Sequence, residues 1–180
     1  LISTVGFGAW AAGGGGWAFA WGPQDDAASV AAIRHAVAKG VNWIDTAAVY
    51  GYGHSEEVVG RALAGIPASE RPLVFTKCGL RWNDADRMAS PVRDSRPARI
   101  REECEASLRR LDVETIDLYQ VHRFDGETPL DETLEALDFL VRQGKVRYLG
   151  CSNFAAWQIA DAAWTARQEH LSPFVSAQNR

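Results

Sequence analysis

Hydrophobic and polar positions follow two periodicities along the chain, one typical of strands and one typical of helices, and these alternate. Short apolar runs, typical of buried strands, begin near positions 3, 41, 73, 115, 146 and 174. Between them, apolar side chains recur every three or four residues, as on one face of a helix; one such stripe is Leu130, Leu134, Leu137 and Val141. Strict alternation of strand and helix indicates an α/β fold with parallel strands joined by crossover helices.

Punctuating residues mark where the elements begin and end. We expect the first strand at residues 2–7, followed by a long loop at 9–22 that includes four consecutive glycines. The proline and aspartates within 23–26 favour the start of a helix. Ser55, followed by two glutamates, predicts another helix start. The charged segment 79–97 predicts a large loop over one end of the domain, without a core strand.

Polar side chains stand at the ends of the apolar runs. In chain order these residues are Asp45, Lys77, His122, Ser152, Asn153 and Gln178. Six strand–helix units fit either a doubly wound sheet or part of an eight-stranded barrel, and the pattern does not choose between them. In both architectures the carboxyl ends of the strands gather on one side and carry the reactive groups. We therefore expect these side chains to share one site.

Tyr50 lies in a glycine-rich turn between Asp45 and Ser55 and completes a set with chemical meaning. A phenol is a weak acid with a pKa of about 10, and a neighbouring ammonium such as that of Lys77 would lower it. Asp45 would supply the counter-charge, and His122 would donate a hydrogen bond to a substrate oxygen. This set suits delivery of a proton to a carbonyl oxygen, and a separate hydride source is then needed.

Each of these four residues also has an ordinary structural interpretation. Asp45 would cap a turn, Tyr50 would be a packed aromatic, Lys77 would cover apolar surface with its stem, and His122 would be a satisfied core histidine. Their placement at successive strand ends favours the catalytic interpretation over four independent coincidences. The loop tryptophans Trp17 and Trp21 either wall a substrate pocket or pack the loop.

Composition narrows the function classes. The 180 residues suffice for one domain, and a net charge of −4 with a pI near 5.6 does not favour binding to nucleic acid or an anionic membrane. No apolar run is long enough for a membrane span. The three cysteines, Cys78, Cys104 and Cys151, have spacings that indicate neither a disulfide framework nor a metal site. We expect reduced thiols in a cytoplasmic protein.

Several motifs carry a resemblance to a known family. The stretches D-T-A-A-V-Y-G-Y-G-H-S-E-E from Asp45, V-F-T-K from Val74, Y-Q-V-H from Tyr119 and G-K-V-R-Y-L-G-C-S-N-F from Gly144 resemble the aldo-keto reductase superfamily, in the family's order. The loop that begins at Trp10 is similar to that of the bacterial, stress-related branches.

The resemblance implies a (β/α)8 TIM barrel that binds NADPH in an extended pose, without a metal, and reduces a small-molecule aldehyde or ketone. Tyr50 would be the general acid, Lys77 would lower its pKa with Asp45 paired to the lysine, and His122 would orient the carbonyl. Ser152, Asn153 and Gln178 would bind the nicotinamide amide. The backbone at Gly8, Ala9 and Trp10 would line the same site, beside Asp45.

The resemblance covers about six of the eight β/α units, so residues 1–180 are expected to form a single, incomplete domain. The segments that would read the adenosine 2′-phosphate belong to the family's last two units, and the preference for NADP over NAD is therefore carried over from the family. We expect the first and sixth strands to leave open edges, and a polypeptide of these six units alone to be marginally stable and to associate. The oligomeric state is open.

Three other interpretations compete. Gly6, Gly8 and Ala11 fit a Rossmann dinucleotide fingerprint, but that motif needs a helix at the turn, and no helix can start before about Pro23. The second alternative is a cofactor-sensing regulatory or binding subunit of the same fold. The third is an inactive remnant.

Overall fold

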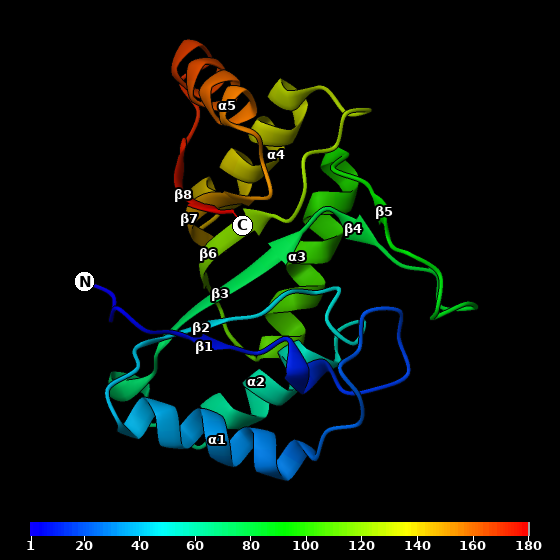
Figure 1. Ribbon diagram of the computed structural model, residues 1–180. Helices are drawn as coiled ribbons and strands as arrows, with labels where there is room; N and C mark the ends of the chain where they lie inside the picture. The colour runs from blue at the N-terminus through cyan, green and yellow to red at the C-terminus, as the bar shows by residue number, and fades with distance from the viewer. Residues whose placement is uncertain (180) are drawn as a thin grey trace.

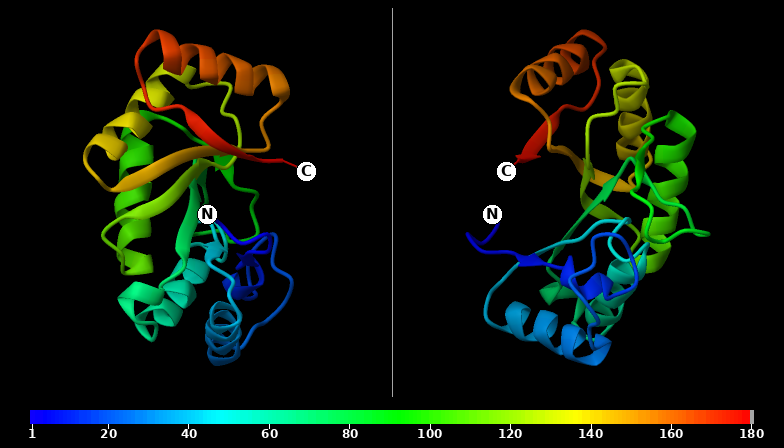
Figure 2. Two further views of the ribbon diagram at one scale, coloured as in Figure 1. Left: turned by 90° about the vertical axis from the view of Figure 1, so that its left-hand side faces the viewer. Right: turned by 45° about the vertical axis from the view of Figure 1, so that its right-hand side comes forward.

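The main sheet consists of six parallel strands that follow one another in chain order (Figure 1). The structure is a computed structural model and describes residues 1–179. The strands of this sheet are β1 Phe7–Gly8, β2 Trp43–Asp45, β3 Leu73–Cys78, β6 Ile116–Val121, β7 Val146–Ser152 and β8 Phe174–Gln178. A doubly wound sheet reverses its strand order at a switch point. This sheet does not, and its curvature is that of part of a β/α barrel (Figure 2).

Five helices wrap around the outer side of the curved sheet. They are α1 Asp26–Ala38, α2 His54–Ala64, α3 Pro97–Leu111, α4 Leu130–Arg142 and α5 Ala156–Gln168, with short 3-10 turns at Ala11–Gly13 and Ala68–Glu70. Consecutive helices pack against one another, and the left view of Figure 2 shows them as an arc around the strands. Apolar side chains from both layers are buried between them, including Ile33, Ile44, Ile100, Leu137 and Leu149. Burial of this layer is the main favourable contribution to the stability of the fold.

The first strand is much shorter than the sequence predicts. Residues 2–5 lie outside the sheet, and the exposed fractions of Ile2 and Val5 are 57% and 68%. The cause is Ser3, whose backbone N–H donates to the Asn42 side chain at 2.7 Å and whose carbonyl accepts from the Trp43 indole at 2.9 Å. These contacts replace the strand ladder, so pairing with β2 begins only at Phe7.

Two predicted helix starts have different outcomes. The Asp25 side chain accepts a hydrogen bond from the Ala28 N–H at 2.9 Å and caps α1, as the sequence predicts. Helix α2 begins at His54, one residue before the predicted start, with Gly53 at the capping position. The Ser55 hydroxyl does not cap; it donates to the Ala9 carbonyl at 2.6 Å and shares a 2.9 Å hydrogen bond with Thr46. Ser55 therefore ties α2 to the ends of β1 and β2.

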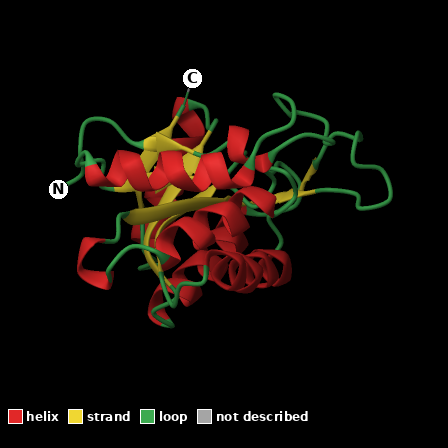
Figure 3. Cartoon of the chain, turned by 90° about the horizontal axis from the view of Figure 1, so that it is seen from below, coloured by secondary structure: helices red, strands yellow, loops and turns green. Residues whose placement is uncertain are grey.

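Residues 79–97 contain no strand of the main sheet, in agreement with the expected large loop. They do contain an antiparallel hairpin that the sequence pattern missed, made of β4 Leu80–Arg81 and β5 Val92–Arg93. Figure 3 shows this hairpin and its connecting loop extending from the body of the molecule. Strands of two residues are too short to give a recognisable alternation of apolar and polar positions.

Among residues 1–179, the outermost strands β1 and β8 pair on one side only, in agreement with the expected open edges. The Rossmann interpretation is wrong, because a 3-10 turn follows β1 and the first α-helix begins only at Asp26. Glycine at position 6 is explained by packing, because a Cβ there would lie 2.2 Å from the Trp43 ring.

All three cysteines are buried and free. Within residues 1–179, no group of three His, Cys, Asp or Glu side chains is arranged to hold a metal ion. None of the helices described is both long and apolar enough to cross a membrane.

Candidate active site

The four side chains predicted to act together do meet at the carboxyl ends of the strands. Asp45 ends β2 opposite Phe75 of the adjacent β3, and Lys77 lies two residues beyond Phe75, within reach of the carboxylate. The Lys77 ammonium donates to Asp45 Oδ2 at 2.6 Å, to the Thr46 carbonyl at 2.9 Å and to the Tyr50 hydroxyl at 3.4 Å. Lys77 is only 2% exposed, so these partners compensate for the loss of its hydration.

A tight turn holds Tyr50 over this ion pair. The next three residues, Gly51, Tyr52 and Gly53, all have positive φ values, of 64°, 59° and 98°. Gly51 is required for a second reason, because a Cβ there would lie 2.2 Å from the carbonyl oxygen of Gly13. The glycines of the long first loop therefore pack directly against the tyrosine turn, which explains why both segments are rich in glycine.

Aromatic contacts and backbone hydrogen bonds fix the orientation of the rings. Trp10 stacks on Tyr50 with the ring centres 5.3 Å apart and an angle of 8° between the planes. His122 meets Tyr50 edge-on at 5.7 Å. The backbone N–H of His122 donates to the Cys78 carbonyl at 2.9 Å, and the backbone carbonyl of His122 accepts from the side-chain amide of Asn153 at 3.1 Å. His122 is thus held at the end of β6 by groups from both neighbouring strands.

The pKa of Tyr50 is shifted upward, opposite to the direction expected from Lys77. Burial is the main cause, and the nearby carboxylate of Asp45 adds to it. Lys77 does not reverse the shift because its ammonium is bonded more closely to Asp45 than to the phenol. A raised pKa keeps the hydroxyl protonated near neutral pH, which is the form that a proton donor needs.

His122 and Lys77 are shifted in the other direction. Burial lowers the pKa of His122 to about 3, with further contributions from Lys77 and Arg123. The imidazole is therefore neutral near pH 7 and can donate one hydrogen bond without carrying a charge. Burial also lowers the pKa of Lys77, and Asp45 opposes that change.

Two cavities meet at Tyr50 and His122. The first, of about 280 Å³, is lined by Gly8, Ala9, Trp10, Asp45, Tyr50, His122, Arg123, Ser152, Asn153, Gln178 and Asn179. The second, of about 310 Å³, is lined by Trp10, Trp17, Phe19, Val49, Tyr50, Leu80, Pro91, Arg93, His122 and Arg123. Trp17 therefore walls a pocket, whereas Trp21 is 74% exposed and stacks on Trp10.

The first cavity is lined by all seven residues that the resemblance assigns to cofactor binding. The Ser152 hydroxyl donates to the backbone carbonyl of Gln178 at 2.9 Å, and the side-chain amide of Asn153 donates to the Ser152 hydroxyl at 2.9 Å. Within residues 1–179, no hydrogen bond uses the side-chain carbonyl oxygens of Asn153 and Gln178. Two free acceptors in one cavity fit the amino group of a carboxamide such as that of nicotinamide.

Other residues of the site escaped the sequence analysis. Gln120 donates to Asp45 Oδ1 at 3.3 Å, and Gln178 donates to Oδ2 of the same carboxylate at 3.3 Å. Glu56 is fully buried and accepts hydrogen bonds from Thr76 and Arg110, both at 2.6 Å. A polar residue inside an apolar strand, such as Gln120 or Thr76, was the available signal for this network.

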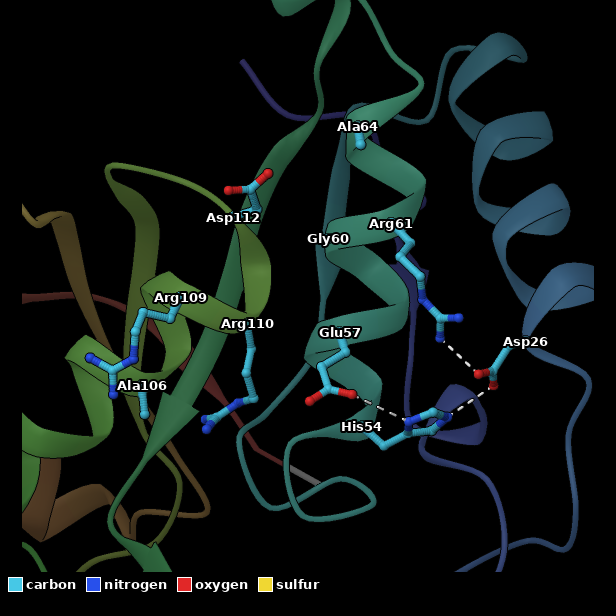
Figure 4. Close-up of a pocket in the computed structure, with 10 residues that line it drawn as sticks. All are labelled: Asp26, His54, Glu57, Gly60, Arg61, Ala64, Ala106, Arg109, Arg110 and Asp112. Carbon is cyan, nitrogen blue, oxygen red and sulfur yellow. Dashed lines mark hydrogen bonds and ion pairs between the residues drawn. The ribbon is translucent and has the colours of Figure 1, made fainter.

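A groove of about 680 Å³ also lies between α2 and α3 (Figure 4). His54 and Arg61 of α2 point to Asp26 of α1, at 2.9 Å and 2.7 Å. Arg109 lies across the groove on α3. No member of the Asp45, Tyr50, Lys77 and His122 set lines this groove, so we assign it a structural role, as the ion-paired junction of three helices.

Glu103 supports the strand end that carries Lys77. It is 4% exposed, and its carboxylate accepts from the Gly79 N–H at 2.8 Å and from Arg99 at 3.1 Å. Burial raises the pKa of Glu103 from its usual 4.5 to about 7. The folded protein therefore binds this proton more tightly than the unfolded chain, and the Glu103 contribution to stability is lost as pH rises from 4.5 to 7.

We predict that Glu103→Gln removes this loss, because an amide keeps the acceptor for Gly79 and cannot ionise. The difference in free energy of unfolding between variant and parent should change by about 3 kcal/mol between pH 4.5 and 7, in favour of the variant at the higher pH. His122 acts in the opposite sense, since its lowered pKa makes stability fall as pH drops from 6.5 towards 3. Only the difference between the two proteins isolates Glu103.

The measurement is urea denaturation across this pH range. Glu102→Gln is the matched control, because Glu102 is the exposed neighbour that also pairs with Arg99. A constant difference between parent and Glu103→Gln at every pH would contradict the assigned pKa shift.

Comparison with known proteins gives one consistent result. The sequence model of the aldo/keto reductase family matches residues 4–180. Aldo-keto reductase YhdN of Bacillus subtilis (strain 168) is 41% identical over 157 residues, covering 87% of this chain and 45% of the relative. The NADH-specific methylglyoxal reductase of Escherichia coli (strain K12) is 38% identical over 170 residues, covering 89% and 51%.

A solved structure, the glycerol dehydrogenase AKR11B4 from Gluconobacter oxydans, superposes with a TM-score of 0.85 at 48% identity. The match covers 99% of this chain and 51% of that one. The fold and site define the class as part of a parallel β/α barrel with a buried polar site at the carboxyl ends of its strands. The chain belongs to the aldo/keto reductase family, and it spans about half the length of the relatives it matches.

Proposed function

We propose that the protein carrying this chain is an oxidoreductase that reduces an aldehyde or ketone to an alcohol with a reduced nicotinamide cofactor. One observation carries the proposal: the Tyr50 hydroxyl lies where a carboxamide-compatible cavity meets a second cavity with mostly apolar and aromatic walls, 3.4 Å from a buried lysine ammonium. The nicotinamide would occupy the first cavity and the carbonyl substrate the second. A proton donor at the junction is then within reach of the carbonyl oxygen.

Each residue has a role that follows from its state. Tyr50 is protonated and gives its proton to the carbonyl oxygen, while the bound cofactor supplies the hydride for the carbonyl carbon. His122 is neutral and donates a hydrogen bond that orients the same oxygen. Lys77 stabilises the phenolate left behind, and Asp45 fixes the lysine in place. Asn153 and Gln178, with Ser152 positioning them, hold the carboxamide of the cofactor.

The choice between NADPH and NADH is part of the test. We retain NADPH as the expected cofactor, while the Escherichia coli relative is named as NADH-specific. Titration of the complete protein with both reduced cofactors measures the two dissociation constants side by side. A much tighter constant for NADPH would support a contact with its additional phosphate.

The reaction itself is tested with a cofactor deuterated at the hydride-bearing carbon of nicotinamide. Mass spectrometry should find one deuterium on the carbinol carbon of the product, across a panel of aldehydes and ketones. Tight cofactor binding without deuterium transfer to any of them would instead favour a cofactor-sensing regulatory subunit. Absence of both binding and transfer would favour an inactive remnant.

A further inference from the structure

The pocket beside Tyr50 has a charge that carbonyl reduction does not require. Two arginines, Arg93 and Arg123, line it together with apolar and aromatic walls, and no carboxylate among residues 1–179 lines it. Arg93 comes from the β4–β5 hairpin, and Arg123 directly follows His122. Such a pocket has a positive electrostatic potential near the arginines, and its other walls are mostly apolar.

A backbone contact ties the Arg93 guanidinium to the segment that carries Arg123. The Arg93 guanidinium donates to the carbonyl of Phe124 at 3.2 Å, and Phe124 is the residue next to Arg123. Arg123 is also close enough to His122 to help lower the pKa of its imidazole. Arg123 and His122 are adjacent in the chain and both line this pocket, so the arginine lies next to the residue that would orient the carbonyl.

The nearest carboxylates in the sequence are bonded elsewhere. Asp94 pairs with Arg96 at 2.7 Å, and Arg81 lies 3.7 Å from it. Asp125 accepts from the Ser95 N–H at 2.8 Å and the Thr128 hydroxyl at 2.7 Å. Within the part of the chain that the structure describes, neither Arg93 nor Arg123 forms an ion pair. Two uncompensated guanidinium groups are the usual protein device for binding carboxylate or phosphate.

We propose that this pocket selects carbonyl compounds that carry a carboxylate or phosphate on an apolar or aromatic body, and that Arg123, with Arg93, binds the anionic group. This inference rests on the proposed function for the position of the carbonyl. Trp17 and Phe19 contact the body of the substrate, and Arg123 sets the charge preference. The phosphates of the cofactor are the other source of the same anionic chemistry, because Arg123 also lines the first cavity.

The test compares para-carboxybenzaldehyde with its methyl ester, two substrates of nearly the same shape that differ in charge. The complete parent protein should prefer the acid. Arg123→Met should lower kcat/KM for the acid by about tenfold or more, mainly through KM, and change the ester by less than about threefold. Arg109→Met is the matched control, because Arg109 is an exposed arginine of the α2–α3 groove and lines neither cavity. It should change neither value.

Equal losses for acid and ester, or no preference in the parent protein, would overturn the proposal. The proposal would also be overturned if Arg123→Met raised the dissociation constant for NADPH and left the ratio of kcat/KM for the acid to kcat/KM for the ester unchanged. Arg123 would then bind the cofactor. Calorimetry with the product alcohol, para-(hydroxymethyl)benzoate, and its methyl ester in the presence of NADPH needs no hydride transfer. A preference for the acid in that titration, lost in Arg123→Met, would support the charge selection even if turnover fails, and no preference would overturn it.

Discussion

Replacing Tyr50 with phenylalanine is expected to remove most carbonyl reduction, lowering kcat of the complete protein by about a hundredfold to ten-thousandfold. Among residues 1–179, Tyr50 carries the one hydroxyl that lines both cavities; the substitution deletes it and leaves the ring stacked on Trp10. The phenol makes one long hydrogen bond, 3.4 Å from Lys77, so its loss should cost little stability. Cofactor affinity should stay within a few-fold of the parent value.

Tyr52→Phe provides the matched control. Tyr52 lies two residues further along the same turn, and its hydroxyl donates to the Arg87 carbonyl at 2.8 Å. It lines neither of the two cavities at Tyr50. Steady-state kinetics and cofactor titration on both variants separate loss of the proton donor from disturbance of the turn. If Tyr50→Phe retained activity within a few-fold of the parent, the assignment of Tyr50 as the general acid would be wrong.

The placement of Tyr50 and its partners was predictable because it follows from chain topology. In a parallel β/α fold, residues that end successive apolar runs lie on one side of the sheet. The pairing of β2 with β3 places Lys77 two residues beyond Phe75, the register partner of Asp45, so that the lysine reaches the carboxylate. The sequential strand order, which selects the barrel over the doubly wound sheet, required the structure, because both architectures share the same alternation of elements.

The electrostatic state of the site was not predictable. The sequence predicts that Lys77 lowers the pKa of Tyr50. The direction of the pKa shift depends instead on how deeply the phenol is buried and on how closely Asp45 holds the lysine. Both quantities arise from packing among segments distant in sequence. The pairing of Gly51 with Gly13 has the same origin, because no local pattern shows which two glycines will touch.

Arg123 illustrates a different kind of failure. The sequence places it beside His122, where it reads as an ordinary charged loop residue. Its significance depends on Arg93, which comes from a hairpin too short to be detected, and on two aspartates that bond elsewhere. An uncompensated charge can be recognised only when all of its neighbours are known.

Replacing Asp45 with alanine is expected to give the largest loss of stability, about 3–5 kcal/mol in the free energy of unfolding. The Lys77 side chain is 1% exposed, and Asp45 is its carboxylate partner, at 2.6 Å. Removing that partner leaves the buried ammonium bonded, among residues 1–179, to the neutral oxygens of Thr46 and Tyr50, and Glu56 acts on it without a direct hydrogen bond. Glu105→Ala is the control, because Glu105 pairs with Lys145 through partly exposed side chains, and its loss should cost less than about 1 kcal/mol.

The double variant Asp45→Ala with Lys77→Met separates structure from catalysis. The double variant has no buried ammonium that needs a carboxylate partner. Much of the lost stability should therefore return, because replacing both members of a buried ion pair costs much less than removing one of them. Activity should not return, because the phenolate of Tyr50 would have no cation beside it. Urea denaturation and steady-state kinetics on both variants give the two readouts. Recovery of activity together with stability would show that the ion pair serves the fold alone, and would remove Lys77 and Asp45 from the proposed catalytic set.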